Sequence, residues 1–212
     1  MAAPGMLGVI LEMEESTMAQ MLHGTDRRAE ASKVQELLLQ MKGELVWFVR
    51  LSADNVLMMN FGSPHLRVRE PNPHNPKNSQ EVIDALERRI VTPSGRWRLA
   101  IWQPEWSVTT KFYACSRSDT SDEKINTTLR QLDGQKLTGI KQMGGDGAYS
   151  LEFDLGGSLQ IGPPEPSGTD PENDEAQWTL FFESGDYINY TSTGKLQNKS
   201  EEQAEFLRPC PK

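Results

Sequence analysis

The chain has 212 residues, of which 25% are charged and 36% hydrophobic, and its formal net charge at pH 7 is −8. This length suits one large domain or two domains of roughly 100 residues each. Because no stretch approaches the roughly 18 consecutive apolar residues that cross a bilayer, the composition excludes a membrane-spanning helix, and we expect no membrane partner.

Two features favour the cytoplasm. Residues 6–13, MLGVILEM, are apolar, but the run is short and no basic residue precedes it, so a secretory signal is not expected. The two cysteines, Cys115 and Cys210, are far apart in the chain and do not indicate a disulfide framework. We therefore expect a cytoplasmic protein, and the sequence leaves its oligomeric state open.

The net charge is unevenly distributed. Residues 1–112 carry 13 acidic and 13 basic side chains, whereas residues 113–212 carry 17 acidic and 9 basic ones. An acidic excess disfavours nucleic acid as a partner, because binding to phosphates needs clustered Lys and Arg. It suits a basic protein partner, and it equally suits a solvated surface that keeps the protein soluble.

Two helices are predicted at corresponding positions of a repeat. Residues 33–49, KVQELLLQMKGELVWFV, align without a gap with residues 124–140, KINTTLRQLDGQKLTGI. The matched apolar positions, spaced as on one face of a helix, are Val34 with Ile125, Leu38 with Leu129 and Met41 with Leu132. Gly43 and Gly134 follow the helices, where a left-handed backbone is expected.

After each glycine the pattern predicts a strand, a turn and a second strand. Leu151, Phe153 and Leu155 alternate with polar residues, which predicts that they face the core. The positions that the alignment assigns to the same face of the first copy are Leu57, Met59 and Phe61. In the next predicted strand, the partner in a hairpin, Leu66 and Val68 of the first copy align with Leu159 and Ile161 of the second.

The copies realign over residues 97–110 and 178–191. The matched positions are Trp97 with Trp178, Leu99 with Leu180 and Ile101 with Phe182. Pro104-Glu105-Trp106 then stands where the second copy has Gly185-Asp186-Tyr187 at a predicted hairpin turn.

These elements predict an α+β fold that is mainly β. We expect two tandem copies of a helix followed by an antiparallel β-meander, packed together, over residues 31–115 and 116–197. Residues 1–30 are predicted to be an N-terminal extension, helical or partly disordered, and residues 198–212 a polar tail. The pattern leaves open whether the strands form a sandwich or one continuous sheet.

The sequence contains no recognisable catalytic, metal or cofactor motif. The three histidines lack the spacing of metal ligands, and the glycine-rich segments lie in predicted turns without a following helix or lysine. Acidic residues are plentiful, and Glu105 and Asp186 occupy equivalent turns, where local hydrogen bonding is their usual role. We therefore assign no catalytic, metal or cofactor residues.

Two segments are candidates for partner binding. Trp102 and Trp106 flank the turn that contains Glu105, and exposed tryptophans are typical of interface hot spots, although packing at the edge of the core would explain them as well. The loop 163–176 contains five acidic residues and no basic one. It is either a solvated loop or a surface that mimics the charge of phosphates and binds in the basic cleft of a partner. These acidic residues are Glu165, Asp170, Glu172, Asp174 and Glu175.

Three motifs carry a resemblance to a known group of proteins. They are FG-x-P-x-L-x-V-x-E-P beginning at Phe61, LDGQ-x-L beginning at Leu132, and FDLGG beginning at Phe153. In this order, over residues 33–197, the chain resembles a family of uncharacterised bacterial proteins that are β-rich, contain two repeats and are similar to immunity proteins encoded beside polymorphic toxins. The family has no established activity, so the resemblance implies no site residues.

The sequence thus predicts a non-enzymatic cytoplasmic binding protein, an immunity- or antitoxin-like inhibitor of a partner protein such as a basic toxin. One alternative is a module that binds a small molecule or carbohydrate in a cleft between the repeats, lined by Trp102, Glu105 and Asp186. Another is an enzyme of unrecognised type.

Overall fold

The structure is a computed structural model that describes residues 29–52, 54–71, 83, 87–144, 147–164 and 174–199. Antiparallel strands dominate these residues, together with a helix at residues 29–39 and helix α3 (Asp122–Arg130). The fold is therefore α+β and mainly β, as predicted. No helix among the described residues is long and apolar enough to cross a membrane.

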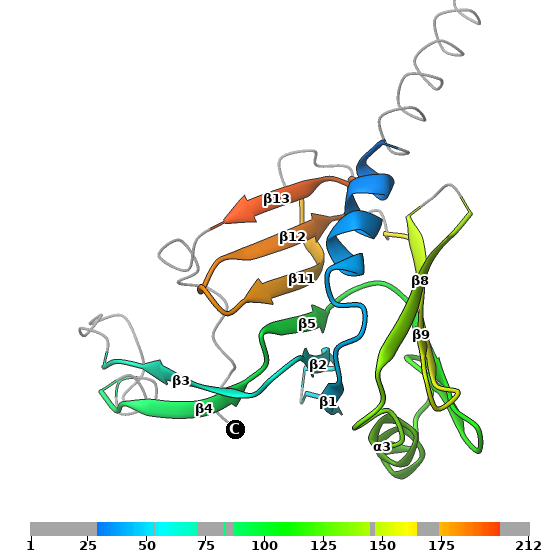
Figure 1. The fold of residues 1–212 in the computed structure, drawn as a ribbon, viewed down its shortest axis with the longest axis horizontal. Coiled ribbons are helices and arrows are strands. Elements are labelled where there is room, and N and C mark those ends of the chain that lie inside the picture. Colours follow the sequence, from blue (N-terminus) through cyan, green and yellow to red (C-terminus); the bar gives the residue numbers. More distant parts are fainter. Residues whose placement is uncertain are drawn as a thin grey trace, which may run out of the picture.

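The strands form two larger sheets and a separate hairpin (Figure 1). Across the six-stranded sheet the order is β1 (Val46–Leu51), β2 (Leu57–Phe61), β5 (Trp97–Ile101), β11 (Ala176–Phe182), β12 (Tyr187–Thr191) and β13 (Leu196–Lys199). Across the five-stranded sheet it is β7 (Ala114–Ser116), β6 (Trp106–Thr109), β10 (Ser158–Ile161), β9 (Ala148–Phe153) and β8 (Leu137–Met143). The hairpin pairs β3 (His65–Arg69) with β4 (Ile90–Ser94).

Each of the two larger sheets contains strands from both predicted halves of the chain. Strand β5 of the first half pairs with β11 of the second, and β6 of the first half pairs with β10 of the second. The prediction of two tandem copies, each with its own meander, is therefore not confirmed.

The segments that follow the two helices hydrogen-bond to each other reciprocally. The backbone N–H of Gly43 donates to the carbonyl O of Leu137 at 2.7 Å, and that of Gly134 donates to the carbonyl O of Val46 at 2.7 Å. Both glycines have positive φ, 91° and 84°, as the sequence predicted for the ends of the helices. These two hydrogen bonds hold the starts of β1 and β8 beside each other.

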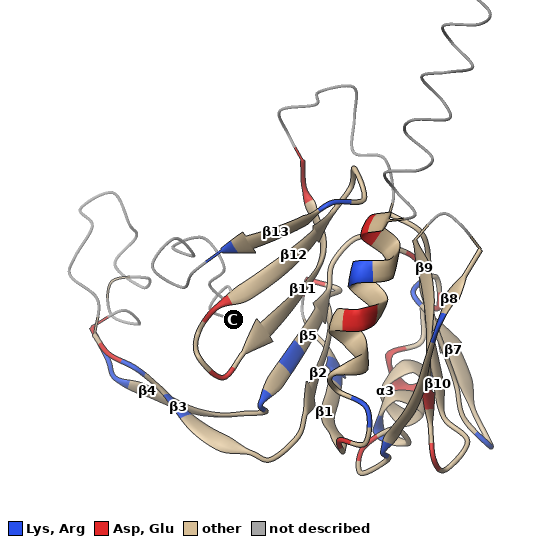
Figure 2. Cartoon of the chain, turned by 45° about the horizontal axis from the view of Figure 1, so that its top comes forward, with Lys and Arg blue, Asp and Glu red and all other residues tan. Residues whose placement is uncertain are grey.

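One hydrophobic core joins the helices and the two larger sheets. The helix at 29–39 stands between these sheets in Figures 1 and 2, where the Tyr149 hydroxyl donates to the Ala31 carbonyl O at 3.1 Å. Helix α3 contacts β1, β6 and β7. Leu57, Met59 and Phe61 are buried in this core, as predicted.

Three apolar residues of the predicted strands are exposed, and the sequence had assigned one of them, Leu155, to the core. Leu155 lies in the turn after β9, beyond the end of the strand, and its side chain is exposed. Leu66 and Val68 are exposed because β3 pairs only with β4 in a separate sheet. Their counterparts Leu159 and Ile161 are buried because β10 lies between β6 and β9.

The predicted ends of the chain lie mostly outside the described residues. Residues 29 and 30, which the sequence assigned to the N-terminal extension, belong to the first helix. At the other end, β13 continues through Lys199, so residues 198 and 199 of the predicted tail are part of the six-stranded sheet.

Candidate functional site

The predicted pair of exposed tryptophans is not present. Trp106 is only 2% exposed and belongs to the hydrophobic core, so its assignment as a partner-binding residue is wrong. It is the first residue of β6, where the side chains of Trp106 and Val108 point inward on alternate positions. Trp102 is partly buried, and its Nε1–H donates to Thr179 Oγ1 at 3.2 Å.

Glu105 and Asp186 are both exposed, but they lie at opposite ends of a strand pair. Because β5 and β11 run antiparallel, Ile101 pairs with Trp178 and Phe182 pairs with Trp97. The turn with Glu105 follows Ile101, whereas the turn with Asp186 follows Phe182. Four residue steps of about 3.3 Å separate these ends, so the predicted cleft of Trp102, Glu105 and Asp186 does not form.

The acidic loop is described only at its end. Glu165, Asp170 and Glu172 lie outside the described residues, while Glu175 is exposed. Asp174 accepts four hydrogen bonds from the turn between β12 and β13 and from the start of β13. The donors are Ser192 Oγ at 3.2 Å, Thr193 N–H at 3.1 Å, Thr193 Oγ1 at 2.9 Å and Gln197 Nε2 at 3.2 Å. This carboxylate therefore holds a turn within the fold.

Replacing Asp174 by alanine should lower the free energy of unfolding by roughly 1–3 kcal/mol, because several partly buried donors lose their acceptor. Burial raises the pKa of Asp174, but hydrogen bonds from Thr191, Thr193 and Ser192 outweigh it and leave the pKa lowered. The contribution of the carboxylate is therefore present above its ordinary pKa of 3.8 and is lost as the pH falls through the lowered value.

Urea unfolding of Asp174→Ala at neutral and acidic pH tests this role. The deficit relative to the unsubstituted chain should shrink in acid, and Glu175→Ala should unfold almost like the unsubstituted chain. An equal loss for both variants, or a deficit for Asp174→Ala that does not depend on pH, would contradict the role of Asp174 in the turn.

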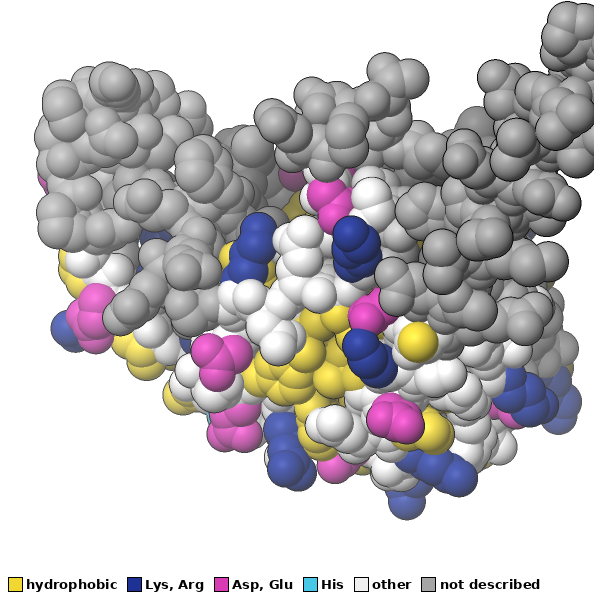
Figure 3. Space-filling view, turned by 90° about the horizontal axis from the view of Figure 1, so that it is seen from above, with side chains coloured by type: hydrophobic (Ala, Val, Ile, Leu, Met, Phe, Trp, Pro, Cys, Tyr) yellow, Lys and Arg dark blue, Asp and Glu magenta, His cyan; other side chains and the backbone are white. Residues whose placement is uncertain are grey.

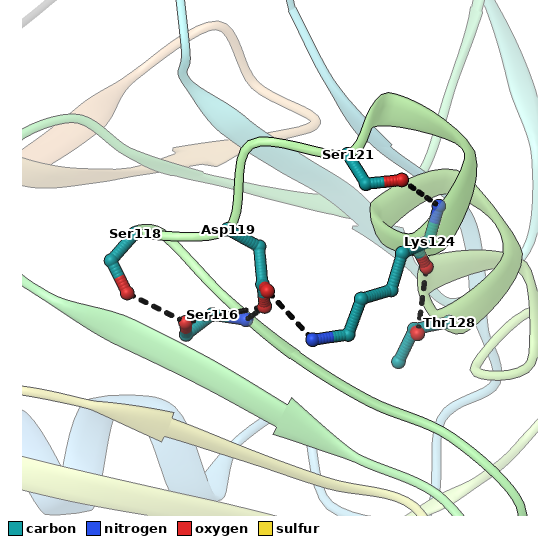
Figure 4. Close-up of polar contacts among 6 residues, drawn as sticks. All are labelled: Ser116, Ser118, Asp119, Ser121, Lys124 and Thr128. Atoms are coloured by element: carbon teal, nitrogen blue, oxygen red, sulfur yellow. Dashed lines mark hydrogen bonds and ion pairs between the residues drawn. The ribbon is translucent and has the colours of Figure 1, made fainter.

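A second polar cluster surrounds the start of α3 (Figure 4). The Asp119 carboxylate accepts from Lys124 Nζ at 2.6 Å and from the Ser116 N–H at 2.8 Å. The Lys124 hydrogen bond is the main reason why the pKa of Asp119 is lowered. Ser121 caps the helix by accepting from the Lys124 N–H at 3.3 Å. All of these bonds are local, so the cluster anchors α3 to β7.

The neighbouring cysteine is not a reactive thiol. Cys115 is buried in the core, and burial raises its pKa. A thiol with a raised pKa is largely protonated at neutral pH and is therefore a poor nucleophile.

A pocket of about 130 Å³ lies between the hairpin and the six-stranded sheet. It brings together strands β3 and β4, strand β5 and residues 181–185, which end β11 and begin the turn to β12. The residues of its lining that carry charge or aromatic surface include His65, Arg67, Arg69, Arg98, Phe181 and Glu183. Figure 2 shows the basic residues of β3 and β5 that flank it. The pocket therefore lies between the two predicted halves, but with other residues than the sequence indicated.

Arg98 is the most unusual side chain of this pocket. Its guanidinium carbon lies 4.2 Å from the ring centroid of Phe181, and its Nε is buried without a hydrogen-bond partner. Burial, and after it the charges of Arg67 and Arg50, lower the pKa of Arg98 to about 10. His65 Nδ1 is likewise buried without a hydrogen-bond partner.

The opposite face of the hairpin is apolar and exposed. Leu66 pairs with Pro93 and Val68 with Val91, which places these four side chains on one face. Leu66 is 71% exposed, Val91 52% and Val68 49%, and Pro93 is also exposed. The sequence pattern aligned Leu66 and Val68 with Leu159 and Ile161, which are buried in β10.

Comparison of the chain with protein-family models, with curated proteins and with solved structures finds no match. The resemblance to two-repeat, immunity-protein-like bacterial proteins therefore stays a prediction from the sequence. Among the described residues, no three or more His, Cys, Asp and Glu side chains group in a way that would hold a metal ion.

Proposed function

We propose that the chain is a non-catalytic binding protein that holds a partner protein on the apolar face of the β3–β4 hairpin. The observation that carries the proposal is the exposure of Leu66, Val68, Val91 and Pro93 on one face of a two-stranded hairpin. Exposed apolar residues that are contiguous are typical of protein interfaces. An isolated two-stranded hairpin is marginally stable in water, so a partner that covers this face would also stabilise it.

The second half of the chain supports this interpretation. In β10 the equivalent residues, Leu159 and Ile161, are buried beneath neighbouring strands. In β3 the same apolar pattern has no such cover among the described strands. A surface that retains the composition of a core strand matches a site that becomes buried in a complex.

The rim of the hairpin favours a partner with acidic groups around an apolar centre. Residues 65–71 and 87–94 include four arginines and two glutamates. On the face shown in Figure 3, acidic and basic side chains are interspersed, so no acidic patch dominates there. A basic toxin as the partner remains a prediction from the acidic loop, three of whose five acidic residues lie outside the described part.

We propose in addition that the two halves of the chain are a repeat and that the protein acts as an inhibitor of its partner. The reciprocal hydrogen bonds of Gly43 and Gly134 support the repeat, because the aligned residues exchange roles. The pairing of β5 with β11 supports it too, since Leu99 pairs with its aligned residue Leu180. An immunity- or antitoxin-like inhibitor in the cytoplasm is the form of protein binding that the resemblance favours.

The test is affinity purification of the full chain from its native cell, with two matched variants. Leu66→Ser with Val68→Ser alters the hairpin face, and Phe112→Ser alters another side chain, 72% exposed, beyond the end of β6. A protein that is retained by Phe112→Ser but lost with the hairpin variant supports the proposal, and its affinity for the purified hairpin variant should be at least about tenfold weaker.

Two results would contradict the proposal. One is that both variants retain the same proteins in the same amounts. The other is that the purified chain forms a dimer which the hairpin variant dissociates, since the face would then be covered by a second copy. Size-exclusion chromatography of the purified chain and of the hairpin variant, before the affinity purification, shows whether such a dimer forms.

A further inference from the structure

We propose that the pocket beside Arg98 binds a small organic carboxylate. The inference is independent of the proposed protein interface, because His65, Arg67 and Arg69 alternate along β3 with Leu66 and Val68 and therefore lie on the other face of the strand. The observation behind it is a cavity of about 130 Å³ lined by Arg98 and His65, each of which has a buried nitrogen atom without a hydrogen-bond partner.

The unsatisfied guanidinium nitrogen indicates an acceptor. A buried donor without a partner costs free energy, and the cost is larger when the donor is charged. Among the ion pairs of the described residues there is none that includes Arg98, and the two charges that lower its pKa, those of Arg67 and Arg50, are positive. An anion in the pocket would supply both a hydrogen-bond acceptor and a compensating charge.

The geometry favours a carboxylate. A guanidinium donates in a planar fork that matches the two oxygens of a carboxylate, and stacking of Arg98 on Phe181 fixes the plane of that fork. His65 Nδ1 can serve as a second polar contact on the opposite wall, which β3 forms. The volume equals only about four water molecules at roughly 30 Å³ each, so the ligand is small.

The remaining lining refines the ligand class. Phe181 and Phe182 contribute apolar surface, which suits a short hydrocarbon chain attached to the acid group. Glu183 also lines the pocket and repels a second negative charge on the ligand. A small monocarboxylate therefore fits better than a dicarboxylate.

Titration of the ¹⁵N-labelled full chain with propionate tests the inference by NMR. The Nε–H signal of Arg98, assigned from its loss in Arg98→Gln, should shift and saturate. Propionamide, which has the same shape without the charge, should leave the signal in place. Titrations with inorganic phosphate and with sodium chloride distinguish a carboxylate site from general attraction of anions.

Two variants give opposite expectations, which separates a lost site from a damaged fold. Arg98→Gln should weaken propionate binding at least tenfold, as followed by the backbone signals of residues 181–185. Glu183→Gln should strengthen it by roughly threefold, because a nearby like charge is removed. The matched control is Arg96→Gln, since Arg96 stacks on Trp97 with its guanidinium carbon 4.5 Å from the ring centroid but does not line the pocket.

The inference is overturned if propionate causes no saturable shift of Arg98, or if sodium chloride at equal ionic strength causes the same shift. It is also overturned if Arg96→Gln weakens binding as much as Arg98→Gln. Tighter saturation by phosphate than by propionate would replace the carboxylate by another oxyanion.

Discussion

Replacing Trp106 by alanine should lower the free energy of unfolding by about 3–5 kcal/mol, because the variant leaves a large cavity in the core. The side chain is 2% exposed and packs in the core that joins both sheets. Urea unfolding followed by circular dichroism measures the effect without depending on tryptophan fluorescence.

Two further variants identify the cause of the loss. Trp102→Ala should cost clearly less, since Trp102 is only partly buried and loses one hydrogen bond to Thr179. Trp106→Phe should recover a large part of the loss, because Trp106 Nε1 has no hydrogen-bond partner that phenylalanine would forfeit. Unfolding of Trp106→Ala at the urea concentration of the unsubstituted chain would show that this side chain lies at the surface.

The assignment of Trp106 shows how an available sequence signal was read incorrectly. The alignment matched Trp106 with Tyr187, and both residues begin a strand and are buried. The proline before Glu105 suggested a turn, and composition alone then favoured an exposed tryptophan. The position of Trp106 two residues before Val108 predicts its burial better, because side chains two positions apart in a strand lie on the same face.

The second large effect is expected at Gly95, between β4 and β5. A Cβ atom at this position would lie 2.6 Å from the carbonyl O of Phe61 and 2.9 Å from the Phe61 N. Since both contacts are with backbone, the neighbour cannot rotate away. Gly95→Ala should therefore destabilise the protein by roughly 2–3 kcal/mol, as measured by thermal and urea unfolding.

Gly139, in strand β8, provides the control, because the nearest contact of an added Cβ atom there is with a flexible side chain. A Cβ atom there would lie 3.1 Å from Glu152 Oε2, the far end of that side chain. Gly139→Ala should lower stability by less than about 1 kcal/mol. If the two variants unfold alike, the close approach of the chain at Gly95 is not as tight as the structure shows.

The mainly β fold and the two helices were predictable, whereas the pairing of strands was not. Local periodicity shows which face of a strand is buried, as at Leu57 and Met59, but it does not show which strand lies beside it. Strands β5 and β11 were recognised as equivalent, yet their direct pairing joins residues far apart in sequence.

The pocket was missed for the same reason. Arg67 and Arg98 alternate with apolar residues and looked like ordinary solvent-facing positions of β3 and β5. Only the pairing of β5 with β11 brings Arg98 to Phe181. Exposure of Leu66 and Val68 was equally hidden, since the same pattern is buried in β10.

The pairing of strands from the first half with strands from the second half determines when the protein can fold during synthesis. When residues 1–116 have left the ribosome, β5 has its partner β2 but lacks β11, and β6 has β7 but lacks β10. Nascent chains of this length therefore expose apolar strand edges until the last third of the chain is made. Folding is then a late event that depends on contacts distant in sequence, and the unfinished chain is the species most prone to aggregation.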